Sequence, residues 1–232
     1  MDDLFADRAI RDRALTRADL QSLRGAQTLI ACDLEEADLA RLDLSGWTFE
    51  QCNLRRADLS GARLERTTWR SCRGAFVNFV GCDLSEASFF ASDINNASMR
   101  RTTLEAARFV GCKLTGVDLS DVKAIDLHVE ETLLINAKLA GRSFHKAHLK
   151  RIDFSQADLR KCDFRLASFE DCSLREAIVD GARFEGADLR GADLGGADLG
   201  GIKLGDASRF RGATISREQA AQLLSEVGLK VR

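Results

Sequence analysis

Proline and tyrosine are absent from the 232 residues, and the chain has only two methionines and three histidines. Because proline cannot donate a backbone hydrogen bond, its absence is typical of a chain whose N–H groups are needed in ladders along most of its length. No apolar run approaches membrane-spanning length. The charged N-terminal segment also lacks the apolar stretch of a secretory signal. We therefore expect a cytoplasmic protein that does not bind a membrane.

A strong excess of charge of either sign is also lacking. The chain carries 34 Lys and Arg against 36 Asp and Glu, which gives a formal net charge of −2. Residues 1–66, 67–150 and 151–232 carry net charges of −3, +2 and −1. Such a balance implies no bulk attraction to nucleic acid or to an anionic membrane. Direct nucleic-acid binding is therefore not expected.

A fivefold repeat is the strongest feature that is present. Counting every fifth residue from Leu29 to Leu204 gives 36 positions, of which 20 are Leu and 9 are Phe; we call these positions the large register. The other seven are Trp69, Gly74, Ile94, Met99, Ala124, Val129 and Val179. Two residues earlier lies the small register, where 26 of 36 residues are Ala, Cys, Ser or Thr.

A period of five matches neither the helix period of 3.6 nor the strand period of 2. It requires a chain that turns a corner every five residues and directs the large and small registers inward. Four such sides close a square coil, and coils stacked by strand-type hydrogen bonds lie about 4.8 Å apart. The repeat predicts an all-β rod of about nine coils, about 43 Å long at that spacing.

The repeated unit, as in Ala57-Asp58-Leu59 and Ala187-Asp188-Leu189, resembles the pentapeptide-repeat family over residues 27–207. The resemblance implies a right-handed quadrilateral β-helix. It also implies that the chain is a binding protein and not an enzyme.

All seven cysteines fall in the small register: Cys32, Cys52, Cys72, Cys82, Cys112, Cys162 and Cys172. A disulfide framework or a zinc site would require side chains paired at bonding geometry. We interpret these cysteines as small buried hydrophobes, which also fits a reducing compartment.

The repeat frame slips at its N-terminal end. Ile10, Leu15 and Leu20 lie one register away from Leu29. Residues 1–26 are therefore predicted to form an N-terminal cap or an incomplete coil, since a bare end would expose the edge of the ladder.

The frame slips again after Leu204, so residues 208–232 are predicted to form a C-terminal cap and a helical tail. Ser216 to Gln219 is a capping-box sequence, and an apolar face follows it at helical spacing. The tail could cover the last coil, or it could form a dimer. The C-terminal order of repeat, slip and helix resembles the Qnr and MfpA-type proteins, whose terminal segments form homodimers. This resemblance favours dimerisation through Ala220, Leu223, Leu224, Val227 and Leu229.

Several positions break the pattern inside the stack. Residues 121–146 are its weakest stretch, with Ala124 and Val129 undersized and Leu127 and Arg142 in the small register. Either the backbone is locally distorted there or a bulge contacts a partner.

Three further exceptions lie nearer the N-terminus. Leu42 and Trp47 overfill the small register, and Gly74 leaves a large position empty, for which Phe76 or Trp69 could compensate. Apolar residues predicted to point outward, and therefore candidates for a partner surface, are Phe76, Phe90, Ile125 and Ile135.

Catalytic and cofactor chemistry have little basis in this sequence. His128 and His148 are twenty residues apart and are expected to stack on one outer column, but no cysteine points outward to complete a metal site. The thirteen Asp residues that precede large positions are interpreted as turn formers that hydrogen-bond the local backbone, not as paired catalytic acids. We expect no enzyme activity, no cofactor and no metal.

Two functions remain. The resemblance to the Qnr and MfpA-type proteins implies binding to a type II topoisomerase, DNA gyrase or topoisomerase IV, and protection of that enzyme from inhibitors, with mimicry of duplex DNA as a mechanism. The alternative is a general protein-interaction scaffold with an unrelated partner.

Overall fold

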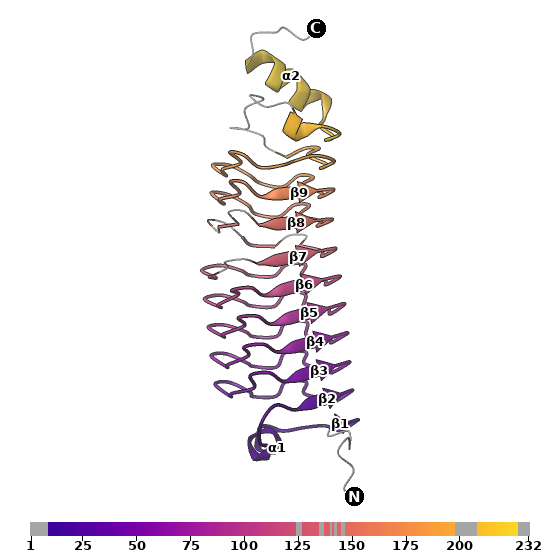
Figure 1. The fold of residues 1–232 in the computed structure, drawn as a ribbon, viewed down its shortest axis with the longest axis vertical. Helices are drawn as coiled ribbons and strands as arrows, with labels where there is room; N and C mark the ends of the chain where they lie inside the picture. The colour runs from indigo at the N-terminus through magenta and orange to yellow at the C-terminus, as the bar shows by residue number, and fades with distance from the viewer. Residues whose placement is uncertain are drawn as a thin grey trace, which may run out of the picture.

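The computed structural model describes residues 9–123, 127–134, 137–139, 141, 143–144, 147–197 and 208–226. The protein is an elongated stack of coils with a helix at each end (Figure 1). The strands are β1 Ile10–Arg11, β2 Thr28–Ile30, β3 Thr48–Glu50, β4 Thr68–Arg70, β5 Ser88–Phe90, β6 Arg108–Val110, β7 His128–Glu130, β8 His148–Lys150 and β9 Ser168–Glu170. The helices are α1 Arg17–Ser22 and α2 Arg217–Glu226.

The strands form one parallel sheet in the order β1 to β9. From β2 onward each strand pairs with the residues twenty positions later, so that Leu29 lies beside Phe49 and Phe49 beside Trp69. The other three sides of the coil are held by parallel bridges with the same spacing, such as Asp33 to Asn53, Asp38 to Asp58 and Asp43 to Arg63. Four ladders per coil confirm the predicted four-sided β-helix.

Large-register residues fill the interior of the rod. Phe49, Trp69, Phe89 and Phe109 stack in consecutive coils, with ring centroids 4.1, 5.3 and 4.7 Å apart. The indole Nε1 of Trp69 donates a hydrogen bond of 2.9 Å to the Thr67 hydroxyl, so its polar atom is satisfied within the core. The stack is therefore a continuous apolar column made from one residue of each coil.

Corners are turned by the second residue after each large position. Across the described coils this residue has a positive φ, as in Glu36 (57°), Gly46 (74°), Arg56 (56°) and Asn96 (55°). The left-handed conformation costs roughly 1–2 kcal/mol for a residue other than glycine, least for Asn and Asp. The coil tolerates it at most corners because the backbone hydrogen bonds on either side hold the turn in place.

Aspartates before the large positions support these corners. Twelve of the thirteen accept a hydrogen bond at Oδ1 from the backbone N–H two residues later, at 2.9–3.2 Å. The thirteenth, Asp198, lies outside the described residues. The predicted turn-forming role is confirmed for the twelve.

The seven cysteines are buried and free, as predicted. Six of the thiols donate to a backbone carbonyl of the preceding coil, for example Cys82 Sγ to Leu59 O at 2.8 Å and Cys162 Sγ to Leu139 O at 3.1 Å. The thiol of Cys112 donates to Val110 O of its own coil at 3.5 Å. Burial raises the pKa of Cys82 and Cys172 to about 12 and that of Cys112 to about 11. At neutral pH these three groups are uncharged thiols with little nucleophilic character.

Both predicted register slips are present. Ile10 pairs with Leu29, nineteen residues later instead of twenty. At the other end Leu194 N donates to Thr214 O, twenty residues later, whereas Leu174 N donates to Asp193 O, nineteen later. One residue is therefore missing from the first turn and one is added to the last.

The N-terminal coil has α1 in place of a regular corner. Arg17 of α1 donates to the carbonyl of Ala40 at 2.9 Å and to Asp38 Oδ1 at 3.1 Å, which ties the helix to the next coil. Leu42 and Trp47 are only 8% and 4% exposed and lie beside this helical segment, so their extra volume fills space that a regular coil would occupy.

Gly74 is compensated by a different residue from those predicted. Phe76 is 54% exposed, and Trp69 packs within its own aromatic column. Ile94, in the next coil, places its Cδ1 only 2.9 Å from where a Cβ on Gly74 would lie. The prediction that Phe76 compensates for Gly74 is wrong, because its side chain lies outside the core.

In the weak stretch, Leu127 is 7% exposed and Val129 is 4% exposed, so both face the core. Ala124 and Arg142, on which the predicted distortion or bulge partly depended, lie outside the described residues.

The contact between Ile94 and Gly74 can be tested by a double-mutant cycle. Ile94→Val removes the methyl group that fills the space and should lower the free energy of unfolding by about 0.5–1.5 kcal/mol. Gly74→Ala should recover part of this loss when it is combined with Ile94→Val but not in the wild type, where its Cβ would meet Ile94 Cδ1. Urea unfolding of the four proteins measures the coupling, and additive effects would contradict the contact.

Candidate functional site

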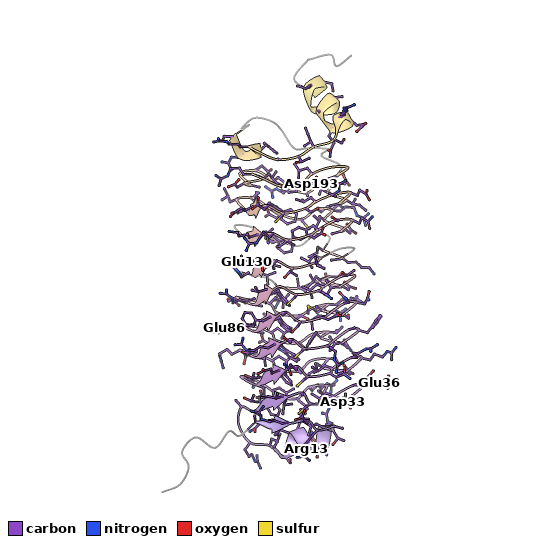
Figure 2. The ribbon with its side chains drawn as sticks, turned by 90° about the vertical axis from the view of Figure 1, so that its right-hand side faces the viewer. Arg13, Asp33, Glu36, Glu86, Glu130 and Asp193 are labelled. Atoms are coloured by element: carbon purple, nitrogen blue, oxygen red, sulfur yellow. The ribbon has the colours of Figure 1, made fainter. Side chains whose placement is uncertain are left out.

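The outward residues of this rod lie along its four long sides, and Figure 2 shows their side chains from one direction. In that view Glu86 and Glu130 mark one edge of the rod, and Asp33 and Glu36 mark the opposite edge. A binding surface has to be built from such outward residues, since the interior is filled by the large and small registers.

Phe76 is the clearest of the predicted surface residues. It is 54% exposed and has a φ of 62° at a corner. Exposing a large aromatic ring to water is unfavourable, and so is a positive φ for a bulky residue. It stacks in register between Arg56, one coil before, and Asn96, one coil after.

The other predicted surface residues are less exposed or not described. Phe90 is half-buried, because the guanidinium of Arg70 covers its ring with Cζ 5.0 Å from the ring centroid. Ile125 and Ile135 lie outside the described residues.

Within the described coils, three exposed large apolar residues were not predicted: Leu166 (53%), Ile178 (47%) and Leu133 (37%). All three occupy outward positions of the repeat, so a search for apolar residues in the outward registers would have found them.

The strand side of the rod divides into two halves of different character. From β2 to β6 its outward residues are mostly uncharged, including Thr28, Thr48 and Thr68. From β7 onward successive strands alternate in charge, and ion pairs join them. Arg151 lies 2.7 Å from both Glu130 and Glu131, and Lys150 lies 3.2 Å from Glu170.

Many charges elsewhere on the rod are paired with near neighbours. Asp158, Asp163 and Asp188 each accept two or more hydrogen bonds from the arginine two residues later. The bond from Arg165 lowers the pKa of Asp163 to about 2. Such local pairing leaves little free charge for a long-range field.

The side chain of His128 lies beside the carboxylate of Glu130. Its Nε2 lies 3.6 Å from Glu130 Oε2 and has no hydrogen-bond partner. His128 and His148 pair in adjacent strands, as predicted, but the side chain of His148 is outside the description. No group of three or more potential metal ligands occurs among the described residues.

Hollows lie near both ends of the described rod. One, of about 400 Å³, lies beside α1 and is lined by Leu20, Leu23, Leu42, Asp43 and Trp47 among others. The second, of about 420 Å³, is lined by Asp188, Arg190, Ser208, Arg209 and Arg211. The hollow beside α1 also contains Ser45, whose hydroxyl and backbone N–H donate to Asp43 Oδ1 at 2.7 and 3.1 Å, as part of the local aspartate turn.

Helix α2 begins with the predicted capping box. Ser216 N donates to Gln219 Oε1 at 2.6 Å, and Gln219 N donates to Ser216 Oγ at 3.2 Å. The amide nitrogen of Gln219 also donates to the carbonyls of Leu194 and Ala197, at 2.7 Å each. Gln219 is only 7% exposed, so one buried side chain both begins the helix and fixes it to the last coil.

The predicted dimer residues follow on the same helix. Ala220 and Leu224 are half-buried within one copy of the chain. The side chain of Leu223, and all of Val227 and Leu229, lie outside the description. Among the described residues, no helix is long and apolar enough to cross a bilayer.

Two family models match this sequence. A pentapeptide repeat region matches residues 27–99, and a model of eight pentapeptide repeats matches residues 82–121, 132–171 and 167–206. Together they cover most of the chain, and neither describes a catalytic domain. The chain belongs to the pentapeptide-repeat family.

Solved structures of other pentapeptide-repeat proteins are similar to this rod. Trypsin-treated QnrB1, a plasmid-mediated fluoroquinolone resistance protein, is 22% identical, with a TM-score of 0.47 over 89% of this chain and 98% of that one. HetL, involved in heterocyst differentiation regulation in the cyanobacterium Nostoc sp. PCC 7120, is 25% identical, with a TM-score of 0.49 over 82% and 86%. Rfr23 from the cyanobacterium Cyanothece 51142 is 18% identical, with a TM-score of 0.34 over 53% and 82%. No curated protein matches the sequence.

Replacing Gln219 tests how α2 is held. Gln219→Leu keeps the apolar bulk but leaves the carbonyls of Leu194 and Ala197 without the donor at Nε2. We expect a loss of about 2 kcal/mol in the free energy of unfolding, because the Ala197 carbonyl loses its donor and an unsatisfied buried group costs about 1–3 kcal/mol. The Leu194 carbonyl keeps the bond from the N–H of Ala197 at 3.1 Å. Amide hydrogen exchange should accelerate in residues 187–197. Arg217→Ala, exposed on the same turn, is the control, and equal effects of the two changes would contradict the anchoring role.

Proposed function

We propose that this chain is a non-enzymatic binding rod that contacts a type II DNA topoisomerase, either gyrase or topoisomerase IV, and protects it from inhibitors. The observation that carries the proposal is the order of elements at the C-terminus. An uninterrupted stack of coils gains one residue and then continues into a capped helix. This order resembles the Qnr and MfpA-type proteins.

Mimicry of duplex DNA is the mechanism that the resemblance suggests, and the charge distribution limits it. A DNA mimic needs a surface with a regular excess of negative charge, as on the phosphate backbone. In this chain no third of the sequence exceeds a net charge of −3, and many aspartates pair with nearby arginines. Contact through specific side chains therefore accounts for binding better than a long-range field does.

A general protein-interaction scaffold is the second candidate. The split character of the strand side favours it, since a mostly uncharged half beside an ion-paired half offers a contact surface unrelated to DNA. Seven free, buried thiols are consistent with a reducing compartment such as the cytoplasm for either function.

We also propose that the functional unit is a homodimer joined through the C-terminal segment, with Ala220, Leu223, Leu224, Val227 and Leu229 in the contact. Two observations support this proposal. Among the described side chains of α2, only Gln219 is fully buried, and Ile215 at the base of the helix is 37% exposed. Apolar residues on so short a helix have little of their own chain to cover them.

A supercoiling assay tests the topoisomerase proposal. Purified chain at micromolar concentration should inhibit gyrase or raise the fluoroquinolone concentration that is needed to stop supercoiling. Relaxation by a type I topoisomerase should be unaffected. If binding depends on specific side chains, the effect should change little with added salt, whereas charge mimicry predicts a steep loss. If the chain neither inhibits the enzyme nor protects it from the drug, the proposal is wrong.

The dimer is tested by Leu223→Glu, which would place a charge in the proposed contact. Light scattering should then give the mass of one chain, where the unchanged protein gives twice that mass. Glu218→Gln, on the exposed first turn of the same helix, is the control and should stay dimeric. An unchanged dimer in the Leu223 variant would move the interface elsewhere.

A further inference from the structure

The pentapeptide that contains Phe76 reverses the pattern of the repeat. Gly74 stands at its large position, where Leu or Phe occurs elsewhere in most repeats. Phe76 stands at its corner, where the other residues with positive φ are mostly polar, small or glycine. The large apolar side chain of this repeat is thus outside the rod, and Ile94 of the next coil fills the space inside. Departures of this kind, which weaken a fold locally, are expected at functional sites.

The coils around Phe76 supply positive charge. Arg56 occupies the same corner one coil before, and Arg55 precedes Arg56 in the chain. Arg73 is the second residue of the repeat that contains Phe76. Arg73 bridges to Asn53, so these coils are in register and about one strand spacing apart. Figure 2 marks the N-terminal end of this side by Asp33 and Glu36.

Two of these three arginines lack a partner. Arg56 lies 3.4 Å from Glu36. Within the part of the chain that the structure describes, Arg55 and Arg73 have no ion pair and no side-chain hydrogen bond. The nearby carboxylates Asp33 and Glu35 accept hydrogen bonds from the amide of Asn53 instead, at 3.0 and 2.9 Å.

Leu166 provides the natural comparison. It is 53% exposed with a φ of 60°, so it combines a large apolar side chain with the same corner conformation. Its neighbour Arg165, however, forms a two-point ion pair with Asp163, with Nη2 to Oδ2 at 2.6 Å. The side chain of Leu166 also lies over Gly186 of the next coil, where a Cβ on Gly186 would be 2.6 Å from Leu166 Cδ2. Leu166 is therefore an exposed apolar residue at a corner whose neighbouring arginine is paired, whereas Phe76 has unpaired arginines nearby.

We infer that Phe76, Arg55 and Arg73 form a docking surface for an acidic segment of a partner protein that also carries an apolar side chain. The exposed ring supplies an apolar anchor, and the two guanidinium groups supply donors for carboxylates on the side of the rod that ends at this corner. Aromatic residues and arginine are the residue types that most often dominate protein interfaces. Carboxylates match the unpaired arginines in charge, which is the reason for choosing an acidic partner. The surface stands apart from the topoisomerase proposal and does not require that enzyme to be the partner.

A matched pair of variants isolates the ring. Phe76→Asn keeps a residue that tolerates a positive φ, as Asn96 does with a φ of 55° one coil later. Leu166→Asn makes the same kind of change at the comparison site. Both variants should melt at or above the wild-type temperature, because both relieve an unfavourable corner. A loss of binding in Phe76→Asn could then not be attributed to unfolding.

The probes are a short synthetic peptide of Asp and Glu residues with one central Phe, its Asn and Gln counterpart, and a single-stranded oligonucleotide. Binding is followed by NMR titration of the labelled full chain. The acidic peptide should bind the wild type and Leu166→Asn equally. Phe76→Asn and the double variant Arg55→Glu/Arg73→Glu should bind it at least about fivefold more weakly. Arg100→Glu/Arg101→Glu, which changes the net charge equally on another side, should bind as the wild type does.

Equal binding of the neutral peptide, or an equal loss in both asparagine variants, would overturn the inference. Tighter binding of the oligonucleotide would assign the surface to nucleic acid instead, and no binding of the acidic peptide at millimolar concentration would also overturn it. If Phe76→Asn loses the peptide but acts on gyrase as the wild type does, the docking surface stands and serves another partner.

Discussion

The backbone ladder between successive coils is the constraint on which the rest of this structure depends. Each coil must close in twenty residues so that its N–H and C=O groups meet those of the next coil. That requirement places a left-handed residue at each described corner and directs two residues of every five inward. The aromatic column, the buried thiols and the aspartate turns all follow from this one spacing. A change of one residue shifts every later side chain, so slips occur where the regular stack begins and ends.

Much of the fold could be predicted from the sequence, because a repeat of five residues determines which side chains point inward and how many residues close one coil. Burial of Leu29 and Cys52 follows directly from their place in the five, and the slips at Ile10 and beyond Leu194 could be counted. The filling of Gly74 could not be predicted in this way. Which neighbour enters an empty core position depends on side-chain direction across coils, and Ile94 is twenty residues away. The contact between the Arg70 guanidinium and the Phe90 ring could not be predicted for the same reason.

The surface was less predictable than the core. Outward positions obey no rule of size or polarity, so exposure of Phe76 could be anticipated but not the state of its neighbours. Whether an arginine is free or paired depends on contacts such as Arg165 with Asp163, which stay within one repeat, and Arg56 with Glu36, which span two. Chemistry on this rod is therefore determined by small differences in pairing between similar repeats. The net charge of the chain therefore does not indicate which of its outward arginines are free to bind a partner.

Gln219 also has a consequence for how long the assembly can grow. A stack of identical ladders has no intrinsic end, and the last coil would offer its carbonyls to any strand with the right spacing, including the first coil of another molecule. In earlier coils a small-register carbonyl accepts the N–H twenty-one residues later, as Ala57 O does from Asn78 N. By occupying the corresponding carbonyl of Ala197 with the side-chain amide of Gln219, the chain ends this ladder with a helix that cannot propagate it. A single glutamine thus helps to separate a particle of defined length from an open-ended fibre.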